Sequence, residues 1–567
     1  MSGRTLFSGG TVLTMTGKPT DAVLVEDGRI VAAGDAATLS DRAGASAKRV
    51  DLAGATLMPG LVDAHPHLLH FSSLALGTCQ LFDARDHEDI VTRIRNHCAI
   101  LPPGMWALCS PVGEPHYFLR RSWRDLAEGV LPDRHVLDRA APDRPVLIQA
   151  WAPVTPNIAV LNSAALREAG ITSETPDKVA GVTIVKDAAG EPTGHLEGPV
   201  NNYYTDDPFW LSIMAHVGAP PDWLWEAGAL AGLAAYNALG VTAGYESHAM
   251  EPAHIEAYRK IRGDGALTMR IAATMDAADL AFDPTKVPDE ASLLARLDLA
   301  KSWEEKRDPL FRFNGITLSR GGPCWPGYLR QNAPYPGPDG TLTSGKTFMP
   351  HEVEMLVVRY CLDHDLRFNM VLGGERDADE FLATMDALTK DIDAAQLDWV
   401  VQHVLMLTGD HCRRIAELGL AVTTSPGFVW GKGALYRERL GEAALANFVP
   451  ARKLIDFGAS VAFGSDWGPD NPFEQMQFAE TQEFCNEGTC THRHHHRITR
   501  EESLKACTVN AARAMQWSDI GALAPGFHAD MSVVDRDPST CPVEDLADTK
   551  VLATFLGGEA VHDTGVM

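Results

Sequence analysis

The sequence lacks the features that would place it in a membrane or outside the cell. It contains no run of about 18 or more apolar residues, which a membrane-spanning helix requires. Met1–Gly10 has no basic region followed by an apolar stretch, so we expect no secretory signal. The 10 cysteines include no Cys-x-x-Cys pair and are unlike a disulfide scaffold. These absences favour a reduced, cytoplasmic protein.

Positive charge is also scarce. The 49 lysines and arginines stand against 75 aspartates and glutamates, and the net charge is −26. Because such a surface repels phosphate backbones and anionic lipids, we expect neither nucleic acid nor a membrane as a partner. The charge names no substrate, and a small molecule remains the expected partner.

The chain does have material for a large core. The hydrophobic fraction is 45%, and 567 residues exceed one ordinary compact domain. Both chain ends favour β structure. Ala22–Val25 and Ile30–Gly34 flank Asp27-Gly28, a strong hairpin signal because both turn positions favour positive φ. Near the C-terminus, Met531–Val534 is an apolar strand and residues 551–561 predict another hairpin.

The middle of the chain alternates short apolar strands with helical stretches. This alternation predicts a (β/α)8 TIM barrel, whose catalytic residues lie at the C-terminal ends of the strands. The expected strands are Leu57–Val62, Gly240–Tyr245, Met269–Thr274, Phe313–Leu318, Arg367–Leu372, Trp399–Val404, Ala421–Thr424 and Val461–Phe463. The helices expected between them include residues 291–305, 351–364, 378–389 and 411–418.

Residues 75–235 fit this alternation poorly. We expect them to form an insertion after the first barrel strand, as a lid or side domain over the barrel mouth. The predicted organisation is therefore a composite small β-sandwich domain of residues 1–58 and 518–567, and a barrel over residues 59–517 that carries the 75–235 insertion.

The sharpest chemical signal is His65-Pro66-His67, which follows an apolar strand. Because strand side chains alternate, residues two apart share a face, and both imidazoles would point into the same space. Two converging neutral imidazoles form half of a metal site. At the end of a barrel strand, this pattern favours metal binding over a structural role.

Two other strands end on polar residues in the same way. Asp466 follows Val461–Phe463, and its carboxylate is suited to bind metal and to accept a proton from water. His403 ends the strand that begins at Trp399. It would either bind the metal or stabilise charge on a substrate carbonyl oxygen. We therefore expect His65, His67, Asp466 and His403 as metal ligands, with Asp466 and His403 also catalytic.

Together these segments resemble the amidohydrolase superfamily of metal-dependent hydrolases, and in particular its amidohydrolase-3 branch, which includes N-substituted formamide deformylases. The similarity runs over essentially the whole chain. Further segments that carry it are Asn162–Ile171, the turn Gly190–Gly194, and Ala506–Ala512 with Gly521 and Pro525–Asp530. The resemblance implies a (β/α)8 barrel, a β-sandwich built from both chain ends, and a homodimer.

The chain departs from the family pattern at three positions. Thr317 stands where the family has a metal-bridging lysine, and Asn157 replaces a histidine before the Asn162 segment. The histidine that ends the fifth strand is also missing, and Asn369 and Glu375 are the nearest oxygen donors there. These departures favour a mononuclear site, with zinc as the first expectation and manganese or iron as alternatives.

Other residues near strand ends are weaker candidates for substrate binding. Glu246 and His248 would be substitute ligands or substrate contacts, or part of a polar loop. Arg320 would bind a substrate carboxylate or lie in a surface loop. Trp430 and Trp467 would line an apolar pocket or simply pack. Asn369 completes this set. The histidines of residues 492–496 are expected in a solvent loop.

The expected reaction is hydrolysis of a non-peptide C–N bond in an amide, a formamide or a cyclic amide by a metal-activated water. One alternative is a degenerate, non-hydrolytic homologue that acts as a binding or regulatory protein. Another is a metal-dependent lyase or isomerase on the same scaffold, because a fold does not fix a reaction class.

Overall fold

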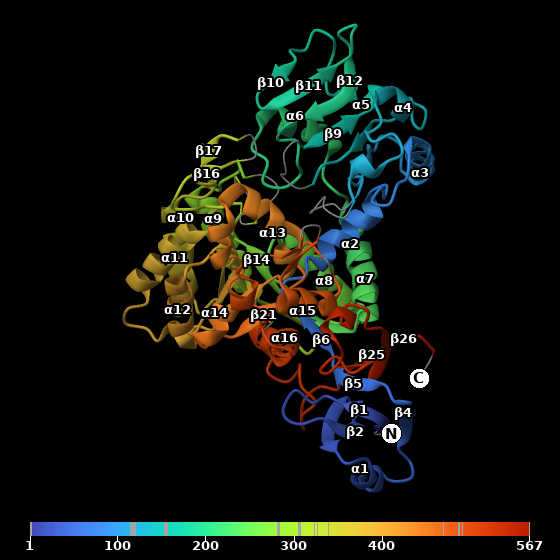
Figure 1. Cartoon of the computed structure of the whole chain (residues 1–567), viewed down its shortest axis with the longest axis vertical. Helices are drawn as coiled ribbons and strands as arrows, with labels where there is room; N and C mark the ends of the chain where they lie inside the picture. Colours follow the sequence, from blue (N-terminus) through green and yellow to red (C-terminus); the bar gives the residue numbers. More distant parts are fainter. Residues whose placement is uncertain are drawn as a thin grey trace.

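The computed structural model describes residues 3–113, 121–151, 157–280, 284–303, 308–322, 324–325, 327–337, 340–468, 470–485, 488–489 and 491–565. Its centre is a sheet of eight parallel strands in the order β21-β20-β19-β18-β15-β14-β13-β6 (Figure 1). The ring closes next to the two outer strands, where the Ala64 amide donates to the Phe463 carbonyl at 3.0 Å. This is the predicted TIM barrel.

The barrel strands fall close to their predicted positions because each is a short apolar run bounded by polar or turn residues. Seven of the eight overlap one expected strand each. The strands are β6 (Leu61–Asp63), β13 (Val241–Glu246), β14 (Arg270–Asp276), β15 (Phe311–Ser319), β18 (Phe368–Leu372), β19 (Val400–His403), β20 (Ala421–Thr424) and β21 (Val461–Phe463).

The exception is the first expected strand, Leu57–Val62, which the structure divides at Gly60. The part before it is β5 (Thr56–Pro59), which pairs with a C-terminal strand, and the part after it is β6. The Gly60 amide donates to Asp530, whereas the next amide donates to Gly240. A side chain at Gly60 would collide with Thr242, so this crossing point requires glycine.

Helices lie between the barrel strands and bury their apolar sides against the strands. The expected helices over 351–364, 378–389 and 411–418 are present, with ends shifted by a few residues, and the one over 291–305 ends earlier, at Ser302; Glu305 lies outside the described residues. The helices of the barrel region are α7 (Asp222–Ala238), α8 (Pro252–Gly263), α9 (Glu290–Ser302), α10 (His351–Asp363), α11 (Glu375–Leu388), α12 (Gly409–Glu417), α13 (Gly427–Leu440), α14 (Ala451–Asp456), α15 (Pro472–Thr481), α16 (Arg500–Ala506) and α17 (Val509–Ala514).

Strands from both chain ends pair into one eight-stranded sheet. Its order is β26-β25-β24-β5-β1-β2-β3, with β4 paired to β1. The predicted hairpin turn is confirmed, since Asp27 and Gly28 have φ of 50° and 74°. The β-sandwich form and the domain boundaries remain predictions. The elements are β1 (Arg4–Val12), β2 (Thr20–Glu26), β3 (Arg29–Gly34), α1 (Ala36–Ala43), β4 (Lys48–Asp51), β24 (Met531–Val534), β25 (Val551–Leu556) and β26 (Glu559–Asp563).

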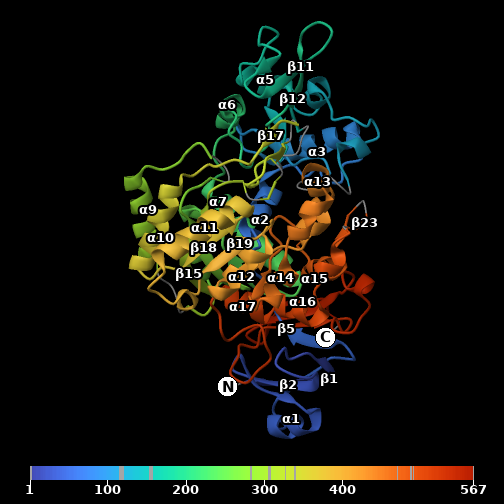
Figure 2. The ribbon, with the colours of Figure 1, turned by 60° about the vertical axis from the view of Figure 1, so that its left-hand side comes forward.

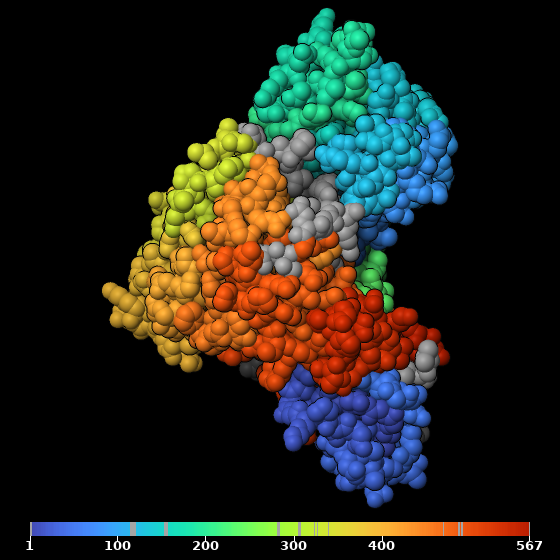
Figure 3. All heavy atoms as spheres, in the orientation of Figure 1, coloured from blue at the N-terminus to red at the C-terminus, as the bar shows by residue number. Residues whose placement is uncertain are grey.

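A six-stranded sheet, in the order β10-β11-β12-β9-β8-β7, lies in the chain between the first two barrel strands. It sits at the opposite end of the molecule from β1 and β2 (Figures 2 and 3). That this region acts as a lid remains a prediction. Its elements are α2 (Leu68–Gly77), α3 (His87–Ile100), β7 (Ala107–Cys109), α4 (Arg134–Asp138), β8 (Val146–Ile148), β9 (Ile158–Leu161), α5 (Ser163–Glu168), β10 (Lys178–Val179), β11 (Val182–Lys186), β12 (Pro192–Glu197) and α6 (Pro208–Val217).

The direction of the strands sets which end of the barrel can hold a site. Since β5 belongs to the terminal sheet and leads directly into β6, the barrel strands start at that sheet and end toward the six-stranded one (Figure 1). Two short hairpins complete the described strands, β16 (Tyr335–Pro336) with β17 (Leu342–Thr343), and β22 (Glu483–Phe484) with β23 (Gly488–Thr489). Among the described helices, none has the length and apolar character that crossing a membrane needs.

Candidate metal centre

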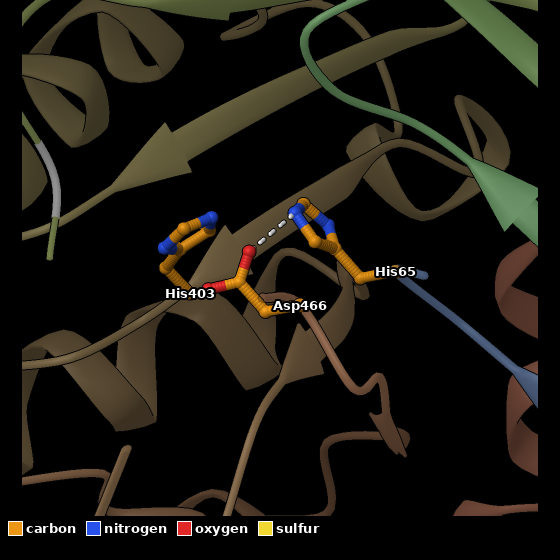
Figure 4. A group of neighbouring side chains, drawn as sticks. All are labelled: His65, His403 and Asp466. Carbon is orange, nitrogen blue, oxygen red and sulfur yellow. Dashed lines mark ion pairs between the residues drawn. The ribbon is translucent and has the colours of Figure 1, made fainter. Parts of the chain in front are cut away.

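Three of the predicted ligands meet at the C-terminal end of the barrel. His65 follows β6, His403 ends β19 and Asp466 follows β21. One potential ligand atom from each lies within 4.8 Å of those of the other two, and all three side chains are buried. The Asp466 carboxylate lies between the two imidazole rings (Figure 4). The barrel thus brings together residues that are far apart in sequence, into a group with the chemistry of a metal site.

His67, the fourth predicted ligand, lies beside this group. Its Nε2 is 3.2 Å from Asp466 Oδ1, and the His65 Nε2 is 3.7 Å from the same oxygen. The two histidines do not converge by strand alternation, however. β6 ends at Asp63, and His67 is the residue immediately before α2. A turn from strand to helix, with φ of 47° at His67, brings the second ring back towards the first.

Three of the four predicted ligands have unusual backbone conformations. His67, His403 and Asp466 have φ of 47°, 66° and 52°. Few residues other than glycine adopt this left-handed region, and each such residue costs of the order of 1 kcal/mol. Backbone hydrogen bonds hold it in place, since the Asp466 amide donates to the His65 carbonyl at 2.7 Å and Thr424 Oγ1 donates to the His403 carbonyl at 2.7 Å. The site therefore holds three strained residues, although others of this kind lie elsewhere in the chain.

The polar atoms of this group also lack hydrogen-bond partners among the described residues. These atoms are His65 Nε2, both ring nitrogens of His67 and of His403, and both carboxylate oxygens of Asp466. Buried polar groups almost always find a partner, because leaving one unsatisfied costs about 1–3 kcal/mol. A divalent cation would satisfy several of these atoms at once. Imidazole nitrogens with a carboxylate are a donor set that suits zinc, so the residues present fit a metal ion.

The electrostatics of the site favour the protonation states that metal binding needs. Burial lowers the pKa of His403 to about 3, and burial with the neighbouring histidines lowers the pKa of His65 well below its usual value. Burial alone would raise the pKa of Asp466, but the nearby His67, His403 and His65 bring it below its usual value. Two imidazoles are therefore neutral and the carboxylate is ionised near pH 7, as ligands require.

Asp63, which the sequence motifs did not single out, links the segment after β6 to the segment after β21 by hydrogen bonds. Its carboxylate accepts hydrogen bonds from the His65 amide at 3.0 Å, from the Ser465 amide at 3.1 Å and from the Ser465 hydroxyl at 2.6 Å. Burial raises the pKa of Asp63 to about 7. The signal for this role was its position, two residues before the first histidine.

Glu246 is the last residue of β13 and His248 lies two residues after it, and their side chains have different roles. Glu246 accepts hydrogen bonds from the Leu69 amide at 2.9 Å and from the Tyr258 hydroxyl at 2.6 Å, so it supports the start of α2. The His248 ring lies 5.7–5.9 Å from the rings of His65, His67 and His403. Its nitrogens face other partners, with Nδ1 3.0 Å from Asp276 and Nε2 3.2 Å from the Tyr204 hydroxyl.

The two candidate tryptophans lie in different places. Trp467 stacks on His67, with ring centroids 4.8 Å apart and an interplanar angle of 23°, so it forms part of the site wall. Trp430 stacks on Phe478 at 5.0 Å and 14° in a separate apolar cluster. The structure therefore brings Trp467 to the predicted ligands, whereas Trp430 packs on a neighbouring helix.

The remaining candidates are engaged elsewhere. The Arg320 guanidinium is buried in ion pairs with Glu354, at 3.1 Å, and with Glu380, so it is neither a surface residue nor turned to a substrate. Asn369 is the second residue of β18, near the start of that strand, and accepts a hydrogen bond from Tyr245 at 2.8 Å. Thr317, at the position where the resemblance implies a lysine, pairs with Thr274 at 2.7 Å and donates to the Ser247 carbonyl.

The histidine-rich segment is mostly, but not wholly, a solvent loop. His494 and His495 are exposed, as expected. His496 is 2% exposed, and burial with nearby cationic groups lowers its pKa to about 4. The expectation of a solvent loop fails at this residue because a short 3-10 turn over Arg493–His495 carries the following side chain inward.

Known proteins share this architecture. A family model described as amidohydrolase family matches residues 48–562. The N-substituted formamide deformylase of Arthrobacter pascens is 26% identical over 556 residues, which cover 95% of this chain and 94% of that protein. Among solved structures, an uncharacterised metal-dependent hydrolase from Pyrococcus horikoshii superposes with a TM-score of 0.71 at 18% identity, over 95% of this chain and 99% of that one. A zinc complex of atrazine chlorohydrolase from Arthrobacter aurescens gives a TM-score of 0.52 at 15% identity, over 99% and 95%.

Proposed function

This chain belongs to the amidohydrolase family, and we propose that it is a metal-dependent hydrolase that cleaves a non-peptide C–N bond at a mononuclear site. The observation that carries the proposal is the convergence of His65, His403 and Asp466, buried and with potential ligand atoms within 4.8 Å. Zinc is the first candidate metal, because imidazole and carboxylate ligands suit it.

Each proposed ligand has a defined role in the reaction. His65, His67 and His403 would hold the metal through neutral imidazole nitrogens, and Asp466 through one carboxylate oxygen. A metal ion bound there would supply a Lewis acid and lower the pKa of a water molecule. His403, if it is not a ligand, would instead face the substrate carbonyl oxygen and stabilise its developing charge.

Asp466 is the proposed proton carrier. Neither carboxylate oxygen has a hydrogen-bond partner among the described residues, so one can bind metal while the other accepts a proton. Its lowered pKa keeps it ionised until it takes that proton. The protonated carboxyl group would then deliver the proton to the leaving nitrogen, acting first as general base and then as general acid.

The opposite side of the barrel supports one metal rather than two. Thr317 occupies the position of the family's bridging lysine, and its hydroxyl is bonded to Thr274 and to the Ser247 carbonyl. Asn369 lies near the start of β18 rather than at its C-terminal end. Neither residue is placed to complete a second site, which supports a mononuclear centre.

The walls of the site support an apolar or aromatic substituent on the substrate. Trp467 stacks on His67, and Phe428 packs against His403 with ring centroids 5.4 Å apart. Aromatic rings of this kind offer large apolar contact area beside a polar centre. Together with the relative that acts on N-substituted formamides, this favours amides or formamides that carry an aryl or alkyl group on nitrogen.

The test uses tag-free protein loaded with zinc and a panel of N-aryl and N-alkyl formamides, their acetamide counterparts and cyclic amides. We expect the wild type to release amine from at least one class. Asp466→Asn should lower kcat by at least about 1,000-fold while metal stays bound, because the amide cannot accept the proton. Asp456→Asn makes the same change on an exposed side chain and is the control.

Two outcomes would contradict the proposal. If Asp466→Asn keeps near-full activity, the carboxylate is not the proton carrier. If the wild type turns over no member of the panel and binds neither zinc nor manganese, the chain is a non-hydrolytic member of its family.

A further inference from the structure

The region between β12 and α7 reaches the metal centre through two consecutive tyrosines. Tyr203 packs on Trp467 with centroids 4.5 Å apart, and Trp467 in turn stacks on His67. The Tyr204 hydroxyl lies 3.2 Å from His248 Nε2. The two side chains therefore meet the histidine group at different points, although they are neighbours in the chain.

The backbone at Tyr204 is what directs its ring to His248. Its φ is 54°, an uncommon value for a bulky residue. Such conformations persist where the surroundings enforce them, and they cluster at functional sites. His67, His403 and Asp466 share this feature, whereas His65 does not, and residues away from the site such as Asp365 have it too.

Behind Tyr204, His248 and Asp276 form a fixed support. His248 Nδ1 is 3.0 Å from Asp276 Oδ1, and because a carboxylate only accepts, Nδ1 carries the hydrogen. The other oxygen of Asp276 accepts from the Met250 amide at 2.8 Å, which fixes the carboxylate. Nε2 is thereby left to the Tyr204 hydroxyl. All three side chains are at most 6% exposed.

The hydroxyl also lies on the proposed substrate side of the site. Tyr204 belongs to a buried aromatic cluster with Tyr203 and Phe428, against which Trp467 packs. Three members of this group each contact a different histidine: Phe428 contacts His403, Trp467 contacts His67 and Tyr204 contacts His248. Among the three, Tyr204 alone carries a hydroxyl group.

We propose that Tyr204 is a catalytic residue whose hydroxyl hydrogen-bonds the scissile amide of the substrate, with His248 and Asp276 as positioning residues. The inference rests on the proposed function, and it adds a group supplied from outside the barrel. The hydroxyl donates its one hydrogen to His248 Nε2, and its oxygen stays available to accept a hydrogen bond from the amide N–H of the substrate.

The test removes one oxygen atom. Tyr204→Phe should lower kcat by about 100-fold on any N–H amide that the wild type hydrolyses, because the buried amide N–H loses its acceptor. Metal content should not change. The matched control is Tyr436→Phe, in the same aromatic cluster, because the Tyr436 hydroxyl has no hydrogen-bond partner among the described residues. We expect the control to stay within about 3-fold of the wild type.

A second variant tests whether His248 positions the Tyr204 hydroxyl. His248→Gln should lower kcat by a similar factor, and the double variant Tyr204→Phe/His248→Gln should be no slower than either single variant, because residues that act as a unit are not additive. A purely structural role would give multiplied losses and would lower the melting temperature in step with activity.

Binding provides a readout that does not depend on turnover. Acetohydroxamate, which carries an amide-like group, should bind zinc-loaded Tyr204→Phe about 10-fold more weakly than the wild type in calorimetry. Unchanged affinity together with kcat within about 3-fold of wild type would overturn the proposal. If the wild type hydrolyses nothing, the hydrolase assignment fails and hydroxamate binding still decides the role of Tyr204. If Tyr204→Phe does not fold, the same two measurements on His248→Gln decide it.

Discussion

The two sides of the barrel's C-terminal region differ in how they treat buried polar groups. Around β6, β19 and β21, His65 Nε2, both ring nitrogens of His403 and both carboxylate oxygens of Asp466 lack hydrogen-bond partners among the described residues. Around β15 and the helices that follow, Thr317 and Arg320 are bound to neighbouring side chains. The first side is arranged to receive a ligand, whereas the second is closed by its own contacts.

This difference teaches that unsatisfied polar atoms mark the functional side better than residue type does. Arg320 has a functional group suited to a substrate carboxylate, yet two glutamates already neutralise it. Asp466 Oδ1 lies 3.2 Å from His67 Nε2, but neither carboxylate oxygen of Asp466 makes a hydrogen bond with the described residues. A buried group that costs stability and has no internal partner is the stronger indication of an external one.

The largest expected effect tests the open side. His65→Ala and His403→Ala should each lower bound zinc to about a tenth of an equivalent or less and reduce kcat by at least about 1,000-fold, because each removes a proposed ligand. Elemental analysis and initial rates would measure this. The control is His411→Ala on α12, a buried histidine that pairs with Asp379. Full metal content in both variants would show that His65 and His403 are not metal ligands, and that their unpaired nitrogens do not mark a metal site.

The next effect tests the closed side. Arg320→Ala leaves the Glu354 carboxylate buried without its cation, and should lower the free energy of unfolding by about 3–5 kcal/mol. KM for a hydrolysed amide should not change. Urea unfolding provides the first quantity and steady-state kinetics the second. Arg413→Ala, which breaks an exposed pair, is the control and should cost less than about 1 kcal/mol. A large rise in KM with little loss of stability would place Arg320 in substrate binding instead.

A smaller effect concerns pH in the metal-free protein. The pKa of His403 is lowered by burial to about 3 in the folded state, while its ordinary value is 6.5. Below pH 6.5 the unfolded chain takes up a proton that the folded chain does not, so the free energy of unfolding should fall as the pH drops. The slope from this residue approaches about 1.4 kcal/mol per pH unit. His65 adds a slope of the same sign.

The contribution of His403 to this pH dependence is isolated by comparing His403→Gln with the wild type. Both proteins are unfolded in urea without metal, between pH 8 and pH 5. The variant should lose less stability than the wild type below pH 6.5, and the two should run in parallel above it. Parallel behaviour over the whole range would mean that His403 is not held in its neutral form by the fold.

The smallest effect is predicted for Thr317→Val, an isosteric change at the position where the resemblance implies a lysine. It removes the hydroxyl that contacts Thr274 and Ser247 and should cost about 1–2 kcal/mol of stability. Metal content and kcat should stay within about 3-fold of the wild type, because Thr317 is not a proposed ligand. Loss of the metal in this variant would show that Thr317 contributes to metal binding, contrary to this account.

Much of this site could be predicted because its signals are local. His403 and Asp466 each follow an apolar strand, and parallel strands deliver such residues to the same end of a barrel. The division of Leu57–Val62 could not be predicted, since an apolar run looks the same whether one sheet or two bury it. The carboxylate partners of Arg320 lie 34 and 60 residues further along the chain, and no local pattern links them.

Tyr204 was missed for a related reason. It lies 44 residues before His248, outside the barrel strands, and its sequence neighbours carry no motif. Only the folded chain shows that the region between the first two barrel strands returns to the candidate metal centre. Residues contributed from such a region depend on tertiary packing, which alternation and spacing do not encode.

The most direct test of the account is the metal stoichiometry of tag-free protein, measured by elemental analysis after equilibration with zinc and removal of the excess. A single open side with one set of ligands predicts about one equivalent of zinc per chain, lost in His65→Ala. Two equivalents, or less than about a tenth of one with no gain from added zinc or manganese, would contradict the mononuclear centre.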